Sequence, residues 1–289
     1  MIYLITDYGE KDYFVCAIKT VIINFCRVLD VDLPLIFDIT HDISSYEPIP
    51  AILNIKSMLD LIPHRSIIVC VVDPEVGSSV LPCLSKHVYK KKEIFFIGRN
   101  NGILGAFVNS KHSFTYQISI RKIEQDIKRR GLFYKVGIKN ISNTFHGRDI
   151  FAPVASILYC DLVKGSNNIQ RFVSNKIKPS YLRIPDPLVG ENQICGKVIY
   201  SDKFGNLVTN IPSSLLPSKI RRIDIEINGN VFMIDRVYKN YLEGQNRDLI
   251  VIANSFGYLE ISKFKQSAED FIKNFGSIKN VKICISLSQ

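Results

Sequence analysis

The residues best suited to chemistry lie around a histidine in the middle of the chain. Residues 144–153 read Thr-Phe-His-Gly-Arg-Asp-Ile-Phe-Ala-Pro, which places His146 beside a glycine and an Arg-Asp pair. From Ile150 to Leu162 apolar residues recur with roughly helical spacing, so we expect His146 at the start of a helix. Unpaired amides and the positive dipole end favour an anionic ligand or nucleophile there. The structural alternative is a helix junction stiffened by a local ion pair.

Four apolar runs in the first hundred residues each end in a polar cluster. The pairs are 2–6 with Asp7 and Asp12, 33–39 with His41 and Asp42, 66–72 with Asp73, and 94–97 with Asn100 and Asn101. Helical patterns begin at Asp12 and span 48–61, and this alternation is typical of a mostly parallel sheet covered on both faces. Ligands bind at the carboxyl ends of such strands. We therefore expect the four clusters to line one site.

The residue types in these clusters limit the ligand. GxGxxG and P-loop patterns are absent, so a glycine-rich phosphate cradle is not expected. Carboxylates at strand ends suit a diol instead, and Asp7 or Asp12 could accept hydrogen bonds from ribose hydroxyls. The seven cysteines are scattered and form no CxxC pair, so neither a metal site nor a disulfide framework is indicated.

The pattern changes after residue 175. We predict an α/β N-terminal domain over 1–175, a linker over 176–192, and a smaller all-β C-terminal barrel domain over 193–289. The expected strands of the second domain are 198–200, 223–227, 231–234, 249–253, 258–261 and 281–287. Asn228-Gly229 between two alternating runs predicts a hairpin. Residues 262–280 show no pattern that places them.

Two clusters of the C-terminal domain have the residue types of a binding site. Asp202, Phe204 and Asn206 lie within five residues and could grip a heterocycle by stacking and edge hydrogen bonds. Asn254 and Ser255, followed by a phenylalanine, repeat the pattern. The structural alternative for each is an Asx turn beside a core aromatic.

Composition bounds the class of protein. The chain has 289 residues, 46% hydrophobic and 22% charged, enough for a large core. Its net charge of +10 is spread along the chain, with short clusters only at 90–92 and 128–130, so we expect solvated surface and no nucleic-acid partner. No apolar run approaches the ~20 residues of a membrane span, and the start lacks a basic leader. We expect a cytoplasmic protein with no membrane partner.

Together the clusters resemble the motifs of one enzyme family. In chain order they are Thr6-Asp7-Tyr8-Gly9 with Asp12, Asp38-Ile39-Thr40-His41, the segments 71–77 and 101–102, and the segments 145–153, 202–211 and 254–261. They resemble the S-adenosylmethionine (SAM) hydroxide adenosyltransferases, also called SAM hydrolases, which are related to the fluorinase and chlorinase. The match is collinear from residue 2 to about 261, and its two longest motifs, 145–153 and 202–211, are specific.

The resemblance implies hydrolysis of SAM to adenosine and L-methionine by water or hydroxide attacking ribose C5′, without a cofactor. It implies a homotrimer with each SAM site between the N-terminal domain of one subunit and the C-terminal domain of the next. Asp73 and His146 match two residues that hold the attacking water. The substrate contacts that it implies are Asp7, Asp12, Tyr46, Asn101, Phe145, Asp202, Phe204, Asn206, Asn254 and Ser255.

The residue types suit this reaction better than a halogenation. A neutral thioether leaves from a sulfonium, so the reaction needs a positioned, partly desolvated nucleophile rather than an acid. Asp73 could orient the water or accept its proton, and His146 could relay or donate one. An anionic Asp73 would repel a halide, and the related halogenases carry tyrosine at both positions.

The chain departs from the family pattern at the third water-holding residue. The family has an arginine seven positions after the aspartate, where this chain has Val80, and a Pro-Asp where this chain has Arg99-Asn100. Loss of a preorganised donor commonly costs ~10²–10³ in rate. In one hypothesis Arg99 supplies the missing cation to a slow hydrolase. The alternatives are a SAM- or adenosine-binding protein with weak or no turnover, and an altered nucleophile or substrate.

Overall fold

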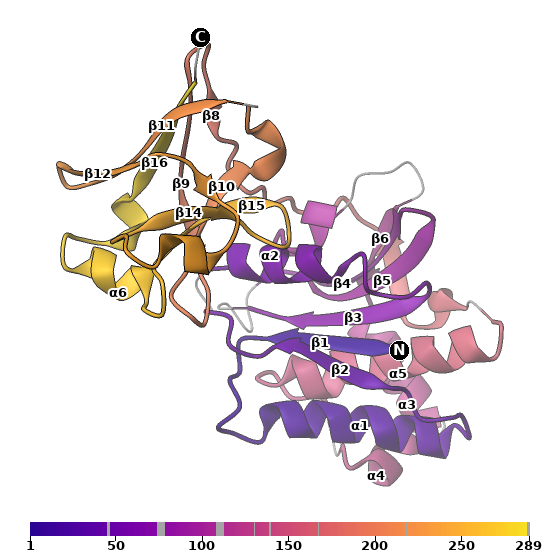
Figure 1. Ribbon diagram of the computed structural model, residues 1–289. Coiled ribbons are helices and arrows are strands. Elements are labelled where there is room, and N and C mark those ends of the chain that lie inside the picture. The colour runs from indigo at the N-terminus through magenta and orange to yellow at the C-terminus, as the bar shows by residue number, and fades with distance from the viewer. Residues whose placement is uncertain are drawn as a thin grey trace. The chain divides into compact units, whose positions relative to one another are not determined.

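The computed structural model describes residues 1–289 except 45–46, 74–78, 108–112, 130, 139, 167, 218 and 288–289. Tyr46 therefore lies outside the described residues. The chain forms two compact units, Met1–Leu182 and Arg183–Gln289 (Figure 1). The division lies within the segment that the sequence predicts to be a linker.

The first unit is built on a seven-stranded mixed sheet in the order β2-β1-β3-β5-β4-β6-β7. The strands are β1 (Ile2–Thr6), β2 (Ile36–Thr40), β3 (Ser66–Val71), β4 (Pro82–Tyr89), β5 (Lys92–Arg99), β6 (Phe114–Ile118) and β7 (Val173–Lys176). β2, β1, β3 and β5 are parallel, whereas β4, β6 and β7 pair antiparallel. The prediction of a mostly parallel sheet is therefore wrong.

The hairpin of β4 and β5 explains this error. Its turn residues Lys90 and Lys91 have φ of 46° and 67°, the left-handed region that two-residue hairpins require. Asn-Gly or Asp-Gly normally occupies such a turn, and a lysine pair carries no such signal. β4 itself contains Ser85, Lys86 and His87, so it lacks the apolar run of a buried strand.

Helices cover the sheet of the first unit on both faces. They are α1 (Phe14–Val28), α2 (Ile49–Met58), α3 (Ile120–Arg129), α4 (Leu132–Val136) and α5 (Ala152–Val163). Figure 1 shows α1, α4 and α5 along one face and α2 along the other. Ile18 and Phe25 of α1 and Ile157 of α5 share one core with Leu4 and Val69 of the strands. This packing holds the strand ends that carry the polar clusters.

The second unit contains a nine-stranded, nearly closed barrel-like sheet in the order β12-β11-β16-β9-β10-β15-β14-β13, with β8 paired to β9. The strands are β8 (Leu188–Val189), β9 (Gln193–Ser201), β10 (Leu207–Pro212), β11 (Ile220–Ile227), β12 (Asn230–Ile234), β13 (Val237–Tyr238), β14 (Ile250–Ala253), β15 (Tyr258–Ser262) and β16 (Lys282–Leu287). All pairs are antiparallel except β13 with β14.

Local turn and cap chemistry accounts for two connections of this unit. Asn228 and Gly229 have φ of 46° and 82° and join β11 to β12, so the predicted hairpin is confirmed. The segment that the sequence leaves unplaced contains the helix α6 (Ala268–Lys273). Ser267 caps this helix by accepting a hydrogen bond from the Asp270 N–H at 2.9 Å.

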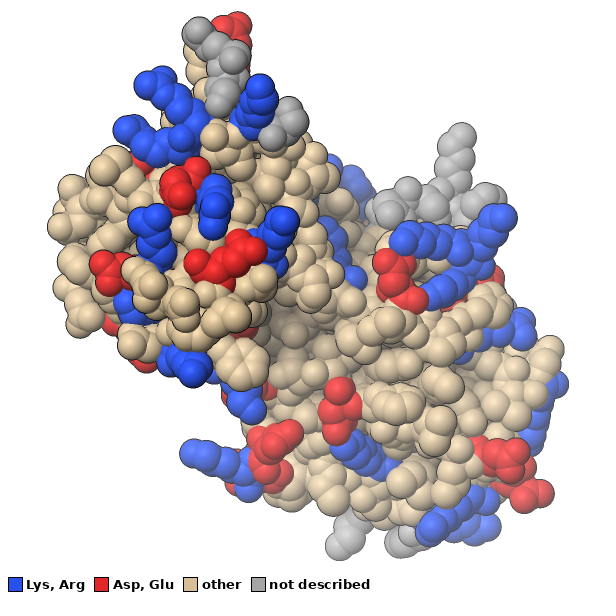
Figure 2. All heavy atoms as spheres, in the orientation of Figure 1, with Lys and Arg blue, Asp and Glu red and all other residues tan. Residues whose placement is uncertain are grey.

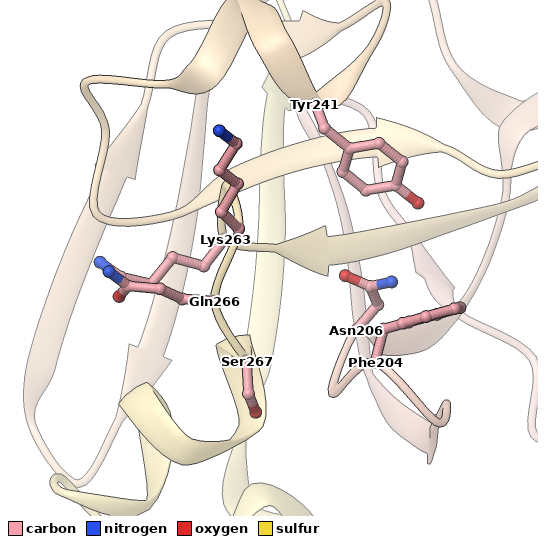
Figure 3. Close-up of a pocket in the computed structure, with 7 residues that line it drawn as sticks. Phe204, Asn206, Tyr241, Lys263, Gln266 and Ser267 are labelled. Atoms are coloured by element: carbon pink, nitrogen blue, oxygen red, sulfur yellow. The ribbon is translucent and has the colours of Figure 1, made fainter.

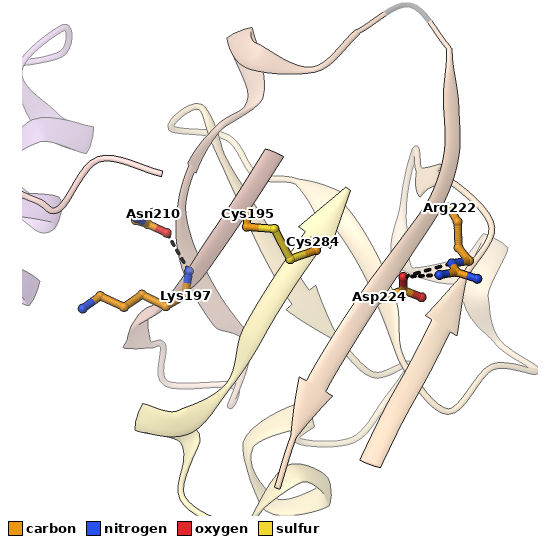
Figure 4. Close-up of a disulfide and its surroundings, with 6 residues drawn as sticks. All are labelled: Cys195, Lys197, Asn210, Arg222, Asp224 and Cys284. Atoms are coloured by element: carbon orange, nitrogen blue, oxygen red, sulfur yellow. Dashed lines mark hydrogen bonds and ion pairs between the residues drawn. A yellow bond between two sulfur atoms is a disulfide. The ribbon is translucent and has the colours of Figure 1, made fainter. Parts of the chain in front are cut away.

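One disulfide joins the neighbouring strands β9 and β16. Cys195 and Cys284 are register partners and their sulfurs are bonded (Figure 4). The expectation that no disulfide is indicated is wrong for this pair. Its members lie 89 positions apart, so only the strand pairing brings them together. The other five cysteines are free thiols.

Charged side chains of both signs are mixed on the surface. Figure 2 shows Lys and Arg interspersed with Asp and Glu on the face that it draws. Exposed pairs such as Lys90 with Asp60 and Lys128 with Glu124 lie within salt-bridge distance, at 2.7 Å each. Among the described residues, no helix has both the length and the apolar character needed to cross a membrane.

Candidate active site

Three polar side chains meet at the carboxyl end of the parallel strands in the first unit. Asp73 follows β3, Arg99 ends β5, and His146 precedes the π-helical turn Gly147–Phe151 that leads into α5. Arg99 Nε lies 3.0 Å from Asp73 Oδ2, and Arg99 Nη1 lies 3.3 Å from His146 Nδ1. One guanidinium therefore joins the carboxylate and the imidazole that the sequence singles out.

The charges of this group are shielded from water. The side chains of Arg99 and Asp73 are 3% and 6% exposed. A buried pair of opposite charges is tolerated because each ion offsets the desolvation of the other. Burial lowers the pKa of His146 and the positive charge of Arg99 lowers it further, against smaller opposing effects of Asp73 and Asp149. The imidazole is therefore neutral at pH 7.

Asp7 and Tyr8 support the group from the end of β1. The Asp7 carboxylate accepts a hydrogen bond from the Asp73 N–H at 3.2 Å, which ties the ends of β1 and β3 together. Burial raises the pKa of the Tyr8 phenol, and the negative charges of Asp7 and Asp73 raise it further, so the phenol stays protonated. A Cβ at Gly147 would lie 3.1 Å from the Tyr8 hydroxyl and 3.1 Å from Ile18. This crowding explains the glycine beside His146.

The other predicted residues of this unit occupy different environments. Asn101 Nδ2 donates to the Val72 carbonyl at 2.7 Å, so its amide clamps the ends of β5 and β3. Phe145 is 5% exposed and packs edge-on against Phe14 and Tyr8, with ring centroids 5.2 Å and 5.8 Å away. Asp12 is exposed in the bend before α1.

His41, from the polar cluster after β2, makes contacts that stabilise the fold. His41 Nδ1 lies 2.9 Å from Thr6 Oγ1, and its Nε2 lies 3.0 Å from Asp38 Oδ1. The histidine is 4% exposed, so these contacts hold the ends of β1 and β2 together. Of the four polar clusters, the structure thus links those of β1, β3 and β5 through the contacts of Asp73 with Asp7 and with Arg99.

Arg99 and His146 border a cavity of about 570 Å³ within the first unit. Polar side chains of Gln117, Ser119, Asn143 and Ser174 line other parts of it. Val80 lines the same cavity, although its side chain can neither donate a hydrogen bond nor carry charge. Sequence reasoning finds Asp73, His146 and Arg99 but not this polar lining, because its members come from separate elements with no shared motif.

In the second unit Asp202 uses its carboxylate within its own loop. Oδ1 accepts hydrogen bonds from the N–H groups of Phe204 and Asn206 at 2.8 Å and 2.9 Å, and Oδ2 accepts from Asn206 Nδ2 at 2.9 Å. This arrangement is the Asx turn that the sequence offers as the structural alternative. The turn holds Phe204 outward, where its side chain is 73% exposed.

Phe204 and Asn206 form one side of a pocket of about 580 Å³. Figure 3 shows them facing Lys263, Gln266 and Ser267, with Tyr241 beside them. The Tyr241 hydroxyl donates to Glu260 Oε1 at 2.7 Å, which orients its ring. Two aromatic rings and two side-chain amides suit a planar heterocycle. Sequence reasoning misses Tyr241, which belongs to neither predicted cluster.

Asn254 and Ser255 lie on the turn between β14 and β15. Asn254 Oδ1 accepts hydrogen bonds from the N–H groups of Phe256 and Tyr258 at 3.3 Å and 3.0 Å. Its Nδ2 is buried without a hydrogen-bond partner in the described part of the chain, which leaves this amide nitrogen to donate to a ligand. Ser255 is exposed. The described residues contain no cluster of His, Cys, Asp and Glu that could hold a metal ion.

Comparison with known proteins gives matches in both units. The family models of the SAM hydroxide adenosyltransferase N-terminal and C-terminal domains match residues 2–166 and 196–274. An (R)-S-adenosyl-L-methionine hydrolase from Methanocaldococcus jannaschii is 30% identical over 279 residues, covering 94% of this chain and 91% of that protein. One from Thermus thermophilus is 23% identical, covering 93% and 94%. The crystal structure of an uncharacterized conserved protein from Thermotoga maritima has a TM-score of 0.78 and 26% identity, covering 99% and 100%.

Proposed function

Because the chain belongs to the SAM hydroxide adenosyltransferase family, we propose that it hydrolyses SAM to adenosine and L-methionine. The observation that carries the proposal is the contact of one guanidinium with both Asp73 and His146. A carboxylate and a neutral imidazole held this close can position one water molecule between them. That water, or the hydroxide formed from it, attacks ribose C5′.

The energetics of the reaction fit such a site. The departing thioether is neutral, so no group has to protonate it, and the barrier depends on the placement and partial desolvation of the nucleophile. The near-complete burial of Asp73 and Arg99 provides this low-polarity environment. No cofactor takes part. The alternative, a SAM- or adenosine-binding protein with weak or no turnover, rests on Val80, and the buried cation beside Asp73 favours hydrolysis over it.

We also propose the roles of the remaining predicted residues. Asp7, Asp12, Tyr46, Asn101 and Phe145 serve the ribose side of the site, either in contact with substrate or by holding the residues that are. Phe204 and Asn206 bind the adenine or methionine part, supported by their place in the aromatic pocket. Asn254 contributes its spare amide donor, with Ser255 beside it, and Asp202 shapes the loop that carries Phe204.

We further propose that the protein is a homotrimer with SAM sites at its subunit interfaces. Its proposed location is the cytoplasm, and we expect no nucleic-acid or membrane partner. Each unit carries polar and aromatic groups suited to a different part of SAM, which supports a site assembled from both. Sedimentation of the purified protein tests the trimer.

Five free thiols support a reducing compartment, whereas the bonded Cys195–Cys284 pair supports an oxidising one. Cell fractionation decides the location.

The test of function is chromatographic detection of adenosine and methionine from the purified protein. Both sulfonium epimers of SAM should be supplied, because the two hydrolases compared are named for the R configuration. Asp73→Asn should lower kcat by ~10²–10⁴, the usual contribution of an acid-base residue, while SAM binding stays measurable by calorimetry. Asp60→Asn, an exposed carboxylate paired with Lys90, is the matched control. Binding of SAM without release of adenosine by the unaltered protein would establish the binding-only alternative.

A further inference from the structure

We infer that Arg99 takes over the role of the arginine that the family carries at the position of Val80, and that it sets the tautomer of His146. The imidazole then presents its proton on Nε2 to the nucleophile, and Asp73 is left as the group that accepts the proton of the water. The inference rests on the proposed hydrolysis and deepens it. Arg99 is a positioning residue, because it acts through Asp73 and His146.

The topology explains how an arginine can move between positions 80 and 99. β4 and β5 pair antiparallel, and Pro82 is the register partner of Arg99. The Asn100 N–H donates to the Leu81 carbonyl at 2.8 Å, which extends the pairing beyond the strands. Val80 lies two positions before Pro82, and both Val80 and Arg99 border the same cavity as His146. The cation missing from the segment before β4 is supplied from the end of β5.

The chemistry of the guanidinium fixes the direction of its hydrogen bond. Arginine remains protonated in proteins and carries only N–H donors. The 3.3 Å contact of Arg99 Nη1 with His146 Nδ1 is therefore a hydrogen bond only when Nδ1 has a free lone pair. A neutral imidazole with a bare Nδ1 carries its proton on Nε2. His146 can then donate to the water or hydroxide oxygen but cannot take a proton through Nδ1.

The reaction step balances with these roles. A lone pair of the water oxygen forms the bond to ribose C5′, and the electron pair of the C5′–S bond leaves on sulfur as the neutral thioether of methionine. The proton of the water passes to Asp73 and then to solvent. Arg99 holds the Asp73 carboxylate in place through the 3.0 Å ion pair, and Nε2–H of His146 holds the oxygen in line.

The charges that face His146 make the inference measurable. These are Arg99, Asp73 and Asp149. The Asp149 carboxylate is already engaged, since it accepts hydrogen bonds from Arg148 Nε and Nη2 at 2.6 Å and 2.9 Å and from the Ser142 N–H at 2.8 Å. Arg99 is the cation that opposes protonation of His146, so its removal must raise the pKa of the imidazole.

The first experiment substitutes Arg99 in the intact protein. Arg99→Ala should lower kcat by ~10²–10³ and leave the KM for SAM within a few-fold, because the guanidinium holds the nucleophile rather than the substrate. The acid limb of the pH profile of kcat should move to higher pH in this variant. Arg99→Lys keeps the charge but loses the planar fork, and should recover part of the rate. Arg65→Ala, at an exposed position just before β3, is the control and should change nothing.

The second experiment returns the arginine to its family position. Val80→Arg combined with Arg99→Ala should restore at least ~10-fold of the rate lost by Arg99→Ala alone, since the new side chain enters the same cavity. Val80→Arg in the presence of Arg99 should bring no gain, because one cation already serves the site. Full activity of Arg99→Ala, or a gain from Val80→Arg alone, overturns the inference.

A measurement that needs no turnover separates this inference from the proposed function. Nitrogen NMR of histidine-labelled protein, with His146 assigned through His146→Gln, should show a bare Nδ1 and a protonated Nε2 in the unaltered chain. Arg99→Ala should abolish this preference, and Arg99→Lys should retain it in part. A protonated Nδ1 in the unaltered protein refutes the assignment even if SAM is hydrolysed. The expected tautomer in a protein that releases no adenosine refutes the hydrolysis instead.

Discussion

The polar clusters of the two units use the same residue types in opposite ways. In the first unit Arg99 joins His146, 47 positions away, and the contacts run between different elements. In the second unit the Asp202 carboxylate accepts hydrogen bonds from Phe204 and Asn206, two and four positions away. Contacts between distant segments assemble buried reactive groups, whereas local contacts build a turn that displays one aromatic ring. An acid near an amide in sequence thus indicates a turn as readily as a site.

Substitution of His146 should have the largest effect on turnover of the substitutions that distinguish the cluster of the first unit from that of the second. His146→Asn removes the ring that we propose faces the nucleophile, so we expect kcat to fall by ~10²–10⁴ with SAM binding retained. Steady-state adenosine release and calorimetric binding of SAM measure the two quantities. His64→Asn, at the end of the segment before β3, is the control. Comparable turnover of both variants would remove the distinction between the clusters.

A smaller effect distinguishes His146 from a histidine that belongs to the scaffold. Burial lowers the pKa of His87 to about 4. As the pH falls below about 6.5, His87 becomes protonated in the unfolded chain but stays neutral in the folded chain. The stability contributed by neutral His87 is complete above that pH and is lost as the pH falls toward 4. Between pH 7 and 5 the loss should be about 2 kcal/mol.

Urea unfolding at both pH values tests this prediction. His87→Gln should show a pH dependence that is smaller by about that 2 kcal/mol, because the substituted side chain does not titrate. His146→Asn should also reduce the pH dependence, because burial and the charge of Arg99 lower the pKa of His146 in the same direction. An equal pH dependence in the unaltered chain and in His87→Gln would show that His87 is not held neutral.

The smallest effects should separate two neighbours within the second unit. Phe204→Ala removes an exposed ring, so we expect a KM for SAM about 10-fold higher, as for the loss of one base-stacking contact, and an unchanged free energy of unfolding. Asp202→Ala removes the acceptor of the loop and should lower the free energy of unfolding by about 1–2 kcal/mol. Kinetics and urea unfolding of both variants give the comparison, and a loss of stability in Phe204→Ala would contradict it.

Much of the scaffold can be predicted because local signals specify it. β1 has the predicted bounds, and Asn228-Gly229 forms the predicted hairpin, since turn chemistry and apolar runs act over a few residues. The Lys90-Lys91 turn has no such signal, and with it the antiparallel half of the first sheet is missed. The Cys195–Cys284 bond depends on strands 89 positions apart, which no local pattern reports.

The order of motifs along the chain was enough to establish the family and to single out Asp73 and His146 as candidate reactive residues, because the type of a residue determines the chemistry that its side chain can perform. Whether Val80 leaves the site without a cation was decided by the tertiary structure alone. The pairing of β4 with β5 carries Arg99 next to both residues. Such register is set by packing between segments distant in sequence. The motif around Val80 therefore does not indicate that Arg99 lies beside Asp73 and His146.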